Sequence, residues 1–209
     1  MATAPREPAS SPSEASRLPD HIVVVDGATW ADYQRALEMR GERRSPRIAY
    51  LEGRLELLSP SRMHETIASV LGCLVEAWCM DRGLDLTPVG SWTLEKKAAE
   101  RGLEPDECYV FGDRDDIDDW ERPDLAIEVV WTSGGLSKLE IYRKLGVPEV
   151  WTWRKGRIHA HRLEGDRYVE IDQSDALPEI DLSLLARLAE VRPMTRAVRE
   201  LRAQAPASG

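Results

Sequence analysis

The stretch PDLAIEVVW, residues 123–131, constrains the fold of this chain more than any other segment. It is short, almost continuously apolar and rich in β-branched residues, which is typical of a strand covered on both faces. Glu128 is the one charge within its apolar part. Because an isolated ionised carboxylate is costly in such a place, we expect Glu128 to be paired with an Arg or Lys, protonated, or bound to a metal ion.

A metal ion at Glu128 would need a second carboxylate from elsewhere. Asp124 points to the same face, but four residues of strand separate the two side chains by roughly 13 Å at about 3.3 Å per residue. Residues 104–111 read as another strand, with an acidic residue near its beginning. Pairing this strand beside the first would bring Asp106 near Glu128, so Asp106 is the expected partner.

The remaining pattern predicts an α/β fold with a mixed central β-sheet flanked by helices. Residues 124–131 form the central strand, and a helix with a buried apolar stripe covers residues 61–82. A second helix spans residues 136–145. Residues 48–58 read as a hairpin that turns at Glu52-Gly53, and residues 86–94 as one strand.

The length of 209 residues fits one ordinary domain. Residues 1–20, rich in Ala, Pro, Ser and Glu, are expected to be a disordered tail. The folded domain is placed at residues 21–190, and residues 191–209 are expected to be a polar C-terminal tail, with a frayed helix as the alternative. No apolar run approaches the ~20 residues that cross a membrane, and no signal peptide is recognisable, so a cytoplasmic location is the default expectation.

The net charge of −9 argues against a general DNA-coating protein, because phosphate contacts depend on Lys and Arg. It leaves room for a nuclease whose basic groups are local. One cluster precedes the predicted hairpin and consists of Arg40, Arg43, Arg44 and Arg47. It is either a phosphate-contacting patch or a solvated loop balanced by nearby glutamates, and we favour the solvated loop.

An ordered set of short motifs resembles the Uma2 family of restriction-endonuclease-like bacterial proteins, also called DUF820, within the PD-(D/E)xK nuclease superfamily. The matching stretches are Tyr50-Leu51-Glu52-Gly53, Leu55-Glu56, Ser59-Pro60, His64-Glu65, Arg101-Gly102-Leu103-Glu104-Pro105-Asp106-Glu107-Cys108, Pro123-Asp124-Leu125 through Glu128-Val129, Lys138-Leu139, and Tyr142 with Gly146-Val147-Pro148-Glu149-Val150-Trp151. The resemblance covers roughly residues 26–190. Each motif alone is weak, and the ordered set is much more specific.

The resemblance implies a restriction-endonuclease-like core and a metal-dependent endonuclease that hydrolyses DNA phosphodiester bonds. Asp106 and Glu128 would hold Mg²⁺ or Mn²⁺. The superfamily's usual lysine position is Val130 here, so Lys138 on the following helix is the expected replacement, and His64 is a further candidate catalytic residue. A homodimer is also expected. The alternative is a catalytically inactive PD-(D/E)xK-like module kept for binding or regulation, which the acidic net charge and Val130 favour.

Overall fold

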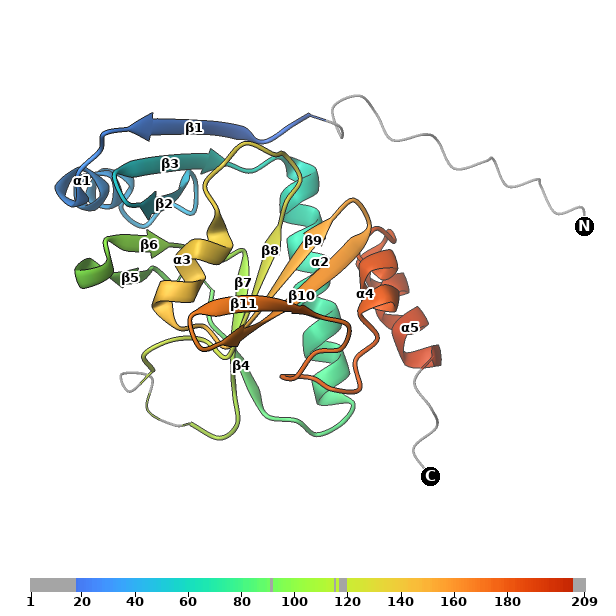
Figure 1. Ribbon diagram of the computed structural model, residues 1–209. Coiled ribbons are helices and arrows are strands. Elements are labelled where there is room, and N and C mark those ends of the chain that lie inside the picture. The colour runs from blue at the N-terminus through green and yellow to red at the C-terminus, as the bar shows by residue number, and fades with distance from the viewer. Residues whose placement is uncertain (1–17, 91, 115, 117–119, 205–209) are drawn as a thin grey trace, which may run out of the picture.

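The computed structural model describes residues 18–90, 92–114, 116 and 120–204. Most of the expected N-terminal tail, residues 1–17, lies outside the described part, as do residues 205–209. Within the described residues, the chain forms a five-stranded and a six-stranded sheet with helices packed against them (Figure 1).

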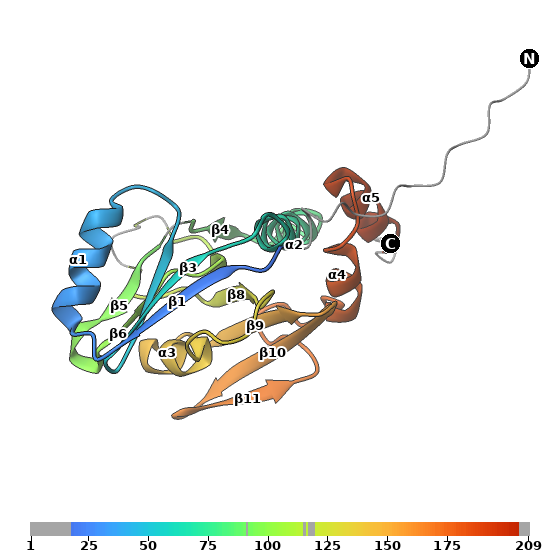
Figure 2. The same cartoon turned by 90° about the horizontal axis from the view of Figure 1, so that it is seen from above.

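The five-stranded sheet is antiparallel throughout. In spatial order its strands are β1 (His21–Asp26), β3 (Arg54–Ser59), β2 (Arg47–Leu51), β6 (Arg101–Leu103) and β5 (Leu94–Lys96). Helix α1 (Trp30–Arg40) lies at one end of this sheet, as Figure 2 shows, and Tyr33 of α1 packs against it. Gly102 of β6 must be glycine, because a Cβ there would lie 2.2 Å from the Tyr33 hydroxyl oxygen.

The six-stranded sheet is mixed and contains the strand with which the sequence analysis began. Its strands in spatial order are β11 (Arg167–Ile171), β10 (Arg157–Glu164), β9 (Glu149–Arg154), β8 (Leu125–Val129), β7 (Glu107–Phe111) and β4 (Leu86–Pro88). Strand β8 runs parallel to β9 and antiparallel to β7, and every one of its side chains is buried. The predicted central, doubly covered strand in a mixed sheet is therefore confirmed.

Two helices cover β8 from opposite faces (Figure 2). Helix α2 (Arg62–Met80) packs on the face that carries Leu125, Ile127 and Val129, whereas α3 (Lys138–Leu145) packs on the face that carries Ala126. The apolar stripe predicted for residues 61–82 is this buried face of α2. No helix in the described part of the chain combines the length and apolar character that a membrane span requires.

The hairpin predicted for residues 48–58 is present as β2 and β3. Both residues of its turn have positive φ angles, 43° at Glu52 and 87° at Gly53, which is the conformation of a tight two-residue hairpin turn. The single strand predicted for residues 86–94 is wrong. Its two ends belong to different sheets, β4 in the six-stranded sheet and β5 in the five-stranded sheet.

The ordered fold extends beyond both expected domain limits. Asp20, placed at the end of the N-terminal tail, is only 6% exposed. At the other end, α4 (Leu182–Leu188) is followed by α5 (Met194–Gln204), a helix within the segment expected to be a polar tail. Ala197 and Leu201 of α5 are buried in the same core as α2, which ties the C-terminal segment to the domain.

The buried Glu149 carboxylate accepts three hydrogen bonds that support the central sheet. Its Oε1 accepts a hydrogen bond from Trp151 Nε1 at 2.5 Å, and its Oε2 accepts from the backbone N–H groups of Asp175 and Ala176, each at 2.9 Å. We predict that Glu149→Ala lowers the free energy of unfolding by about 2–4 kcal/mol, because the buried Trp151 Nε1–H and two part-buried backbone N–H groups lose their acceptor. Urea denaturation measures this. The control is Asp172→Ala, an exposed carboxylate with an expected change under about 0.5 kcal/mol. Equal effects of the two substitutions would contradict the stabilising role of the Glu149 hydrogen bonds.

Candidate functional site

Asp106 lies where β7 begins, beside the end of β8. The two strands pair with Glu107 opposite Ile127, so one further step along the ladder places Asp106 opposite Glu128. The backbone N–H of Val129 donates to Asp106 Oδ2 at 2.6 Å and fixes the carboxylate against β8. The strand pairing from which the sequence analysis placed Asp106 near Glu128 is therefore present.

His64 and Asp106, two of the candidate residues, are in direct contact. Ser61 caps the N-terminus of α2 by accepting from the His64 backbone N–H, and this places the imidazole toward β7. Its Nε2 lies 3.0 Å from Asp106 Oδ2. Both side chains are almost completely buried, with 2% and 1% exposure.

Asp20 completes a chain of polar contacts behind His64. Its Oδ2 lies 3.0 Å from His64 Nδ1, and its Oδ1 accepts from the Ser61 backbone N–H at 2.7 Å. Burial by itself raises the pKa of Asp20, but the hydrogen bonds from His64 and the Ser61 backbone outweigh it and leave the pKa below its ordinary value. A charged Asp20 therefore orients the His64 ring toward Asp106. The sequence analysis assigned Asp20 to the tail and missed this role.

Arg47, the first residue of β2, provides the cation at Asp106. Its Nη1 forms an ion pair with Asp106 Oδ1 and lies 3.2 Å from His64 Nε2. Its Nη2 donates to Glu65 Oε1 at 2.9 Å. Arg47 thus joins the five-stranded sheet to both α2 and the beginning of β7.

Glu128 has a neutral partner instead of a cation. Tyr142 of α3 donates its hydroxyl to Glu128 Oε1 at 2.5 Å, and no Arg or Lys of the described residues forms an ion pair with Glu128. Burial, and then the charge of Glu128, raise the pKa of Tyr142, so the hydroxyl keeps its proton and remains a donor. Of the three alternatives for Glu128, pairing with Arg or Lys is therefore absent from the described residues.

Lys138 begins α3 and contacts a different carboxylate from the one expected. Its Nζ lies 3.1 Å from Oε1 of Glu56, a residue of β3 whose side chain is 2% exposed. The other oxygen of Glu56 accepts from the Leu136 backbone N–H at 2.5 Å. Gly135 makes room for this arrangement, because a Cβ there would lie 2.3 Å from Glu56 Oε2. Glu56 is a buried charge that the sequence analysis did not single out.

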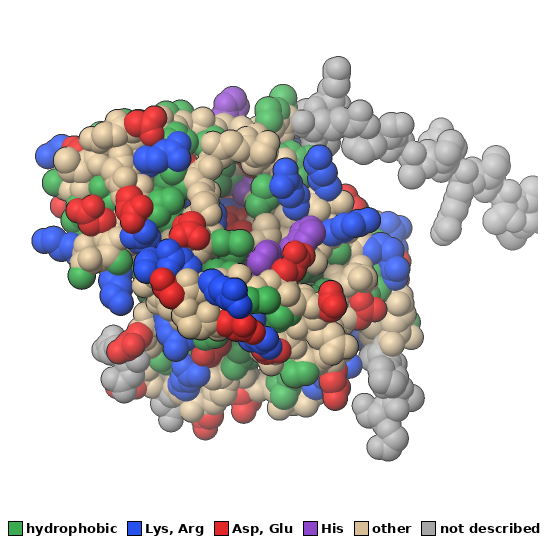
Figure 3. Space-filling view, viewed as in Figure 1, with side chains coloured by type: hydrophobic (Ala, Val, Ile, Leu, Met, Phe, Trp, Pro, Cys, Tyr) green, Lys and Arg blue, Asp and Glu red, His purple; other side chains and the backbone are tan. Residues whose placement is uncertain are grey.

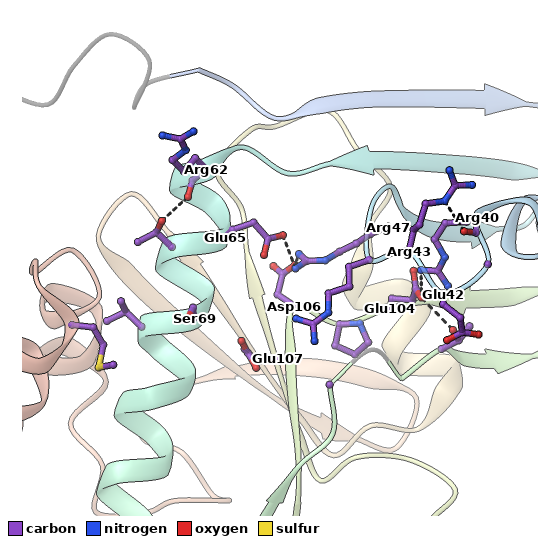
Figure 4. Close-up of a pocket in the computed structure, with 18 of the residues that line it drawn as sticks. Arg40, Glu42, Arg43, Arg47, Arg62, Glu65, Ser69, Glu104, Asp106 and Glu107 are labelled. Carbon is purple, nitrogen blue, oxygen red and sulfur yellow. Dashed lines mark hydrogen bonds and ion pairs between the residues drawn. The ribbon is translucent and has the colours of Figure 1, made fainter.

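A cavity of about 830 Å³ opens beside Asp106 (Figure 4). Asp106, Glu107 and Glu65 lie on one side of it, and residues of the loop after α1 lie on the other. Its arginines are Arg40, Arg43, Arg44, Arg47, Arg62 and Arg192. Neither Arg44 nor Arg62 forms an ion pair with any described residue. Arg40, Arg43, Arg44 and Arg47 therefore line the same cavity as Asp106, and because Arg43 and Arg44 are also solvent-exposed, both alternatives for this cluster stay open.

The six arginines of this cavity lie among five acids, which are Glu42, Glu65, Glu104, Asp106 and Glu107. On the face shown in Figure 3, basic and acidic side chains are intermixed and neither sign dominates. An acidic protein can still attract a polyanion if a concave site concentrates its basic groups. The net charge of −9 is therefore compatible with a local anion-binding site.

Glu107 adds an unusual carboxyl group to the cavity. Burial, together with the charge of Glu76, raises its pKa to about 7, although Arg47 opposes the shift. Glu107 points to the α2 face, where its carboxyl group approaches Gly72. It alternates with Asp106 along the strand, so the two acids face different sides of the sheet.

The candidate metal ligands are two carboxylates, and His64 contacts one of them, with its Nε2 3.0 Å from Asp106 Oδ2. No group of three acidic, His or Cys residues able to hold a metal ion occurs in the described part of the chain. Asp106 Oδ1 is buried and has no well-formed hydrogen bond, which leaves one oxygen free to bind a cation once Arg47 moves. Two oxygen ligands fit a hard cation that keeps several water ligands, so Asp106 and Glu128 are chemically suited to Mg²⁺ or Mn²⁺.

Comparisons with known proteins agree with the motif resemblance. The model of the Uma2 family, described as "putative restriction endonuclease", matches residues 30–194. A search of curated proteins gave no match. Among solved structures, the chain is similar to a protein from Anabaena variabilis described as "a putative nuclease belonging to DUF820", with 16% identity and a TM-score of 0.46 over 83% of this chain and 99% of that one. Because the family model covers well over half of the sequence, this protein belongs to the Uma2 family.

Proposed function

We propose that this protein is a Mg²⁺- or Mn²⁺-dependent endonuclease that hydrolyses DNA phosphodiester bonds. The observation that carries the proposal is the buried Asp106 carboxylate at the edge of an arginine-lined cavity. Membership of a family whose model is described as "putative restriction endonuclease" supports it. A phosphodiester substrate needs cations around its phosphates and acidic ligands for a metal ion, and this cavity offers both.

Each candidate residue receives a role from its contacts. Asp106 and Glu128 would hold the metal ion, with Asp106 oriented by the Val129 backbone and His64, and Glu128 oriented by Tyr142. The bound ion supplies a more acidic water molecule and offsets charge at phosphorus. Arg44 and Arg62 are free to bind backbone phosphates of the DNA.

Lys138 remains our proposed residue for orienting the attacking water. In the structure Glu56 holds its ammonium group, and no described contact joins it to Asp106 or Glu128. The proposed role therefore requires Lys138 to exchange Glu56 for substrate or water. The strand position that usually carries the lysine is Val130, which has no charged group to offer.

The alternative function is a catalytically inactive binding or regulatory module. One sequence feature and two contacts favour it: Val130 replaces the usual lysine, Glu56 engages Lys138, and Arg47 engages Asp106. The two functions differ in whether the purified protein cuts DNA.

We predict that the wild-type protein cleaves supercoiled plasmid or single-stranded DNA with Mg²⁺ or Mn²⁺ and is inactive in EDTA. Asp106→Asn should lower the cleavage rate about 100-fold or more, because a neutral amide binds a hard cation poorly. The matched control is Asp124→Asn. Asp124 also follows a proline, but its Oδ2 accepts from the Phe111 backbone N–H at the opposite end of β8. A wild-type protein that never cuts would favour the inactive module.

The same assay tests Lys138, with one structural complication. Lys138→Ala leaves the Glu56 carboxylate buried without its counter-ion, so the variant loses stability as well as any catalytic amine. The double variant Glu56→Gln/Lys138→Ala removes both charges and should regain stability. We expect it to remain inactive. Cleavage at the wild-type rate by the double variant would exclude a catalytic role for Lys138.

We also propose a homodimer, formed through the free edge of β1. This strand ends the five-stranded sheet, and Val23 and Val25 are 54% and 44% exposed on one face. Antiparallel pairing centred on Val24 would place Val23 of one copy opposite Val25 of the other and extend the sheet.

Light scattering tests the dimer. We expect twice the chain mass for the wild type and the single-chain mass for Val23→Lys/Val25→Lys, because charged side chains on an edge strand oppose pairing. The control is Leu84→Lys, an exposed apolar residue outside β1. A wild-type protein that is monomeric at every concentration would refute the dimer.

A further inference from the structure

We propose that Arg47 couples DNA binding to metal binding. In the free protein it neutralises Asp106, and when substrate enters it moves to a phosphate and leaves Asp106 free for the metal ion. This inference rests on the proposed nuclease function, because it concerns the same carboxylate. It assigns to Arg47 a substrate contact that the motif resemblance does not include.

Arg47 occupies the oxygen of Asp106 that a metal ion would need. Oδ2 already accepts from the Val129 backbone N–H and lies 3.0 Å from His64 Nε2. Oδ1 is buried and has the Arg47 ion pair as its contact, without a well-formed hydrogen bond. The oxygen left for a cation is therefore the one that the guanidinium blocks.

One of the two carboxylates that hold Arg47, Glu65, holds it only weakly. Its side chain is 12% exposed, and Nη2 binds Glu65, whose side chain is 53% exposed. An ion pair to such an exposed carboxylate is screened by water and contributes little. Arg47 lines the cavity with Arg43 and Arg62, so a phosphate in the cavity would lie within its reach (Figure 4).

The positive charge of Arg47 also opposes metal binding in the free protein. A guanidinium beside Asp106 repels a divalent cation and competes for the same oxygen, so the free protein should bind metal weakly. A phosphodiester offers the guanidinium two oxygens that match its planar fork, and charge-assisted bonds of this kind are among the strongest hydrogen bonds. When Arg47 moves to the phosphate, the metal ion no longer meets a positive charge at Asp106. The phosphate also adds a negative charge beside the site, which attracts the ion.

Isothermal titration of Mn²⁺ without DNA tests the blocking contact. We expect Arg47→Gln to bind Mn²⁺ about tenfold more tightly than the wild type, because one positive charge leaves Asp106. Arg47→Lys keeps the charge and should bind like the wild type. Arg62→Gln removes a charge from the same cavity without touching Asp106, and its Mn²⁺ affinity should change less than about twofold.

Fluorescence anisotropy with a labelled DNA duplex in EDTA tests the phosphate contact. Arg47→Gln should bind the duplex less tightly than the wild type, and the dependence of log affinity on log salt should become shallower by about one. The comparison is made without metal, so it reports on the arginine alone.

The outcomes separate this inference from the proposed function. If Arg47→Gln binds Mn²⁺ no more tightly than the wild type, while Asp106→Asn abolishes binding, the coupling is wrong and the metal site stands. If Arg47→Gln binds the duplex like the wild type with the same salt dependence, the phosphate contact is wrong. If neither the wild type nor Arg47→Gln binds Mn²⁺, the metal site fails, and the proposed function and the coupling are both overturned.

Discussion

The contact between Arg47 and Asp106 is the interaction on which the candidate site depends. Asp106 is almost completely buried, and a charged carboxylate in that position would be costly without compensation. Arg47, His64 and the Val129 backbone supply that compensation from β2, α2 and β8. The two sheets and the long helix therefore meet at one acid, and the geometry of the site follows from their packing.

The candidate residues divide between the cavity and the packing of α3, although Asp106 and Glu128 lie opposite each other where β7 and β8 pair. The cavity beside Asp106 is lined by arginines and by Glu107, which suits an anionic substrate. Glu128, Tyr142, Lys138 and Glu56 lie on the α3 side, where buried charges are matched within the protein. The function that we propose needs both sides to act on one phosphate, so release of the Arg47 and Lys138 ion pairs is part of the account.

The sequence predicted the helices and strands that carry a local pattern of apolar or turn-forming residues. Strand β8, helix α2 and the hairpin at Glu52-Gly53 each carry a local signal of apolar spacing or turn chemistry. Asp106 and Glu128 were paired through strand logic and the motif resemblance. Contacts between distant segments carry no such signal: Asp20 reaches His64 across 44 positions, and Glu56 reaches Leu136 across 80. Local charge balance also does not show which cavity a loop lines, so the position of the loop arginines beside Asp106 came from the structure.

The most direct test of this account is anomalous diffraction from crystals soaked in Mn²⁺ together with a short phosphorothioate DNA duplex. We predict a manganese peak about 2 Å from carboxylate oxygens of both Asp106 and Glu128, with the Arg47 guanidinium on a phosphate instead of on Asp106. A peak bound to other acids, or no peak while Arg47 still contacts Asp106, would contradict it.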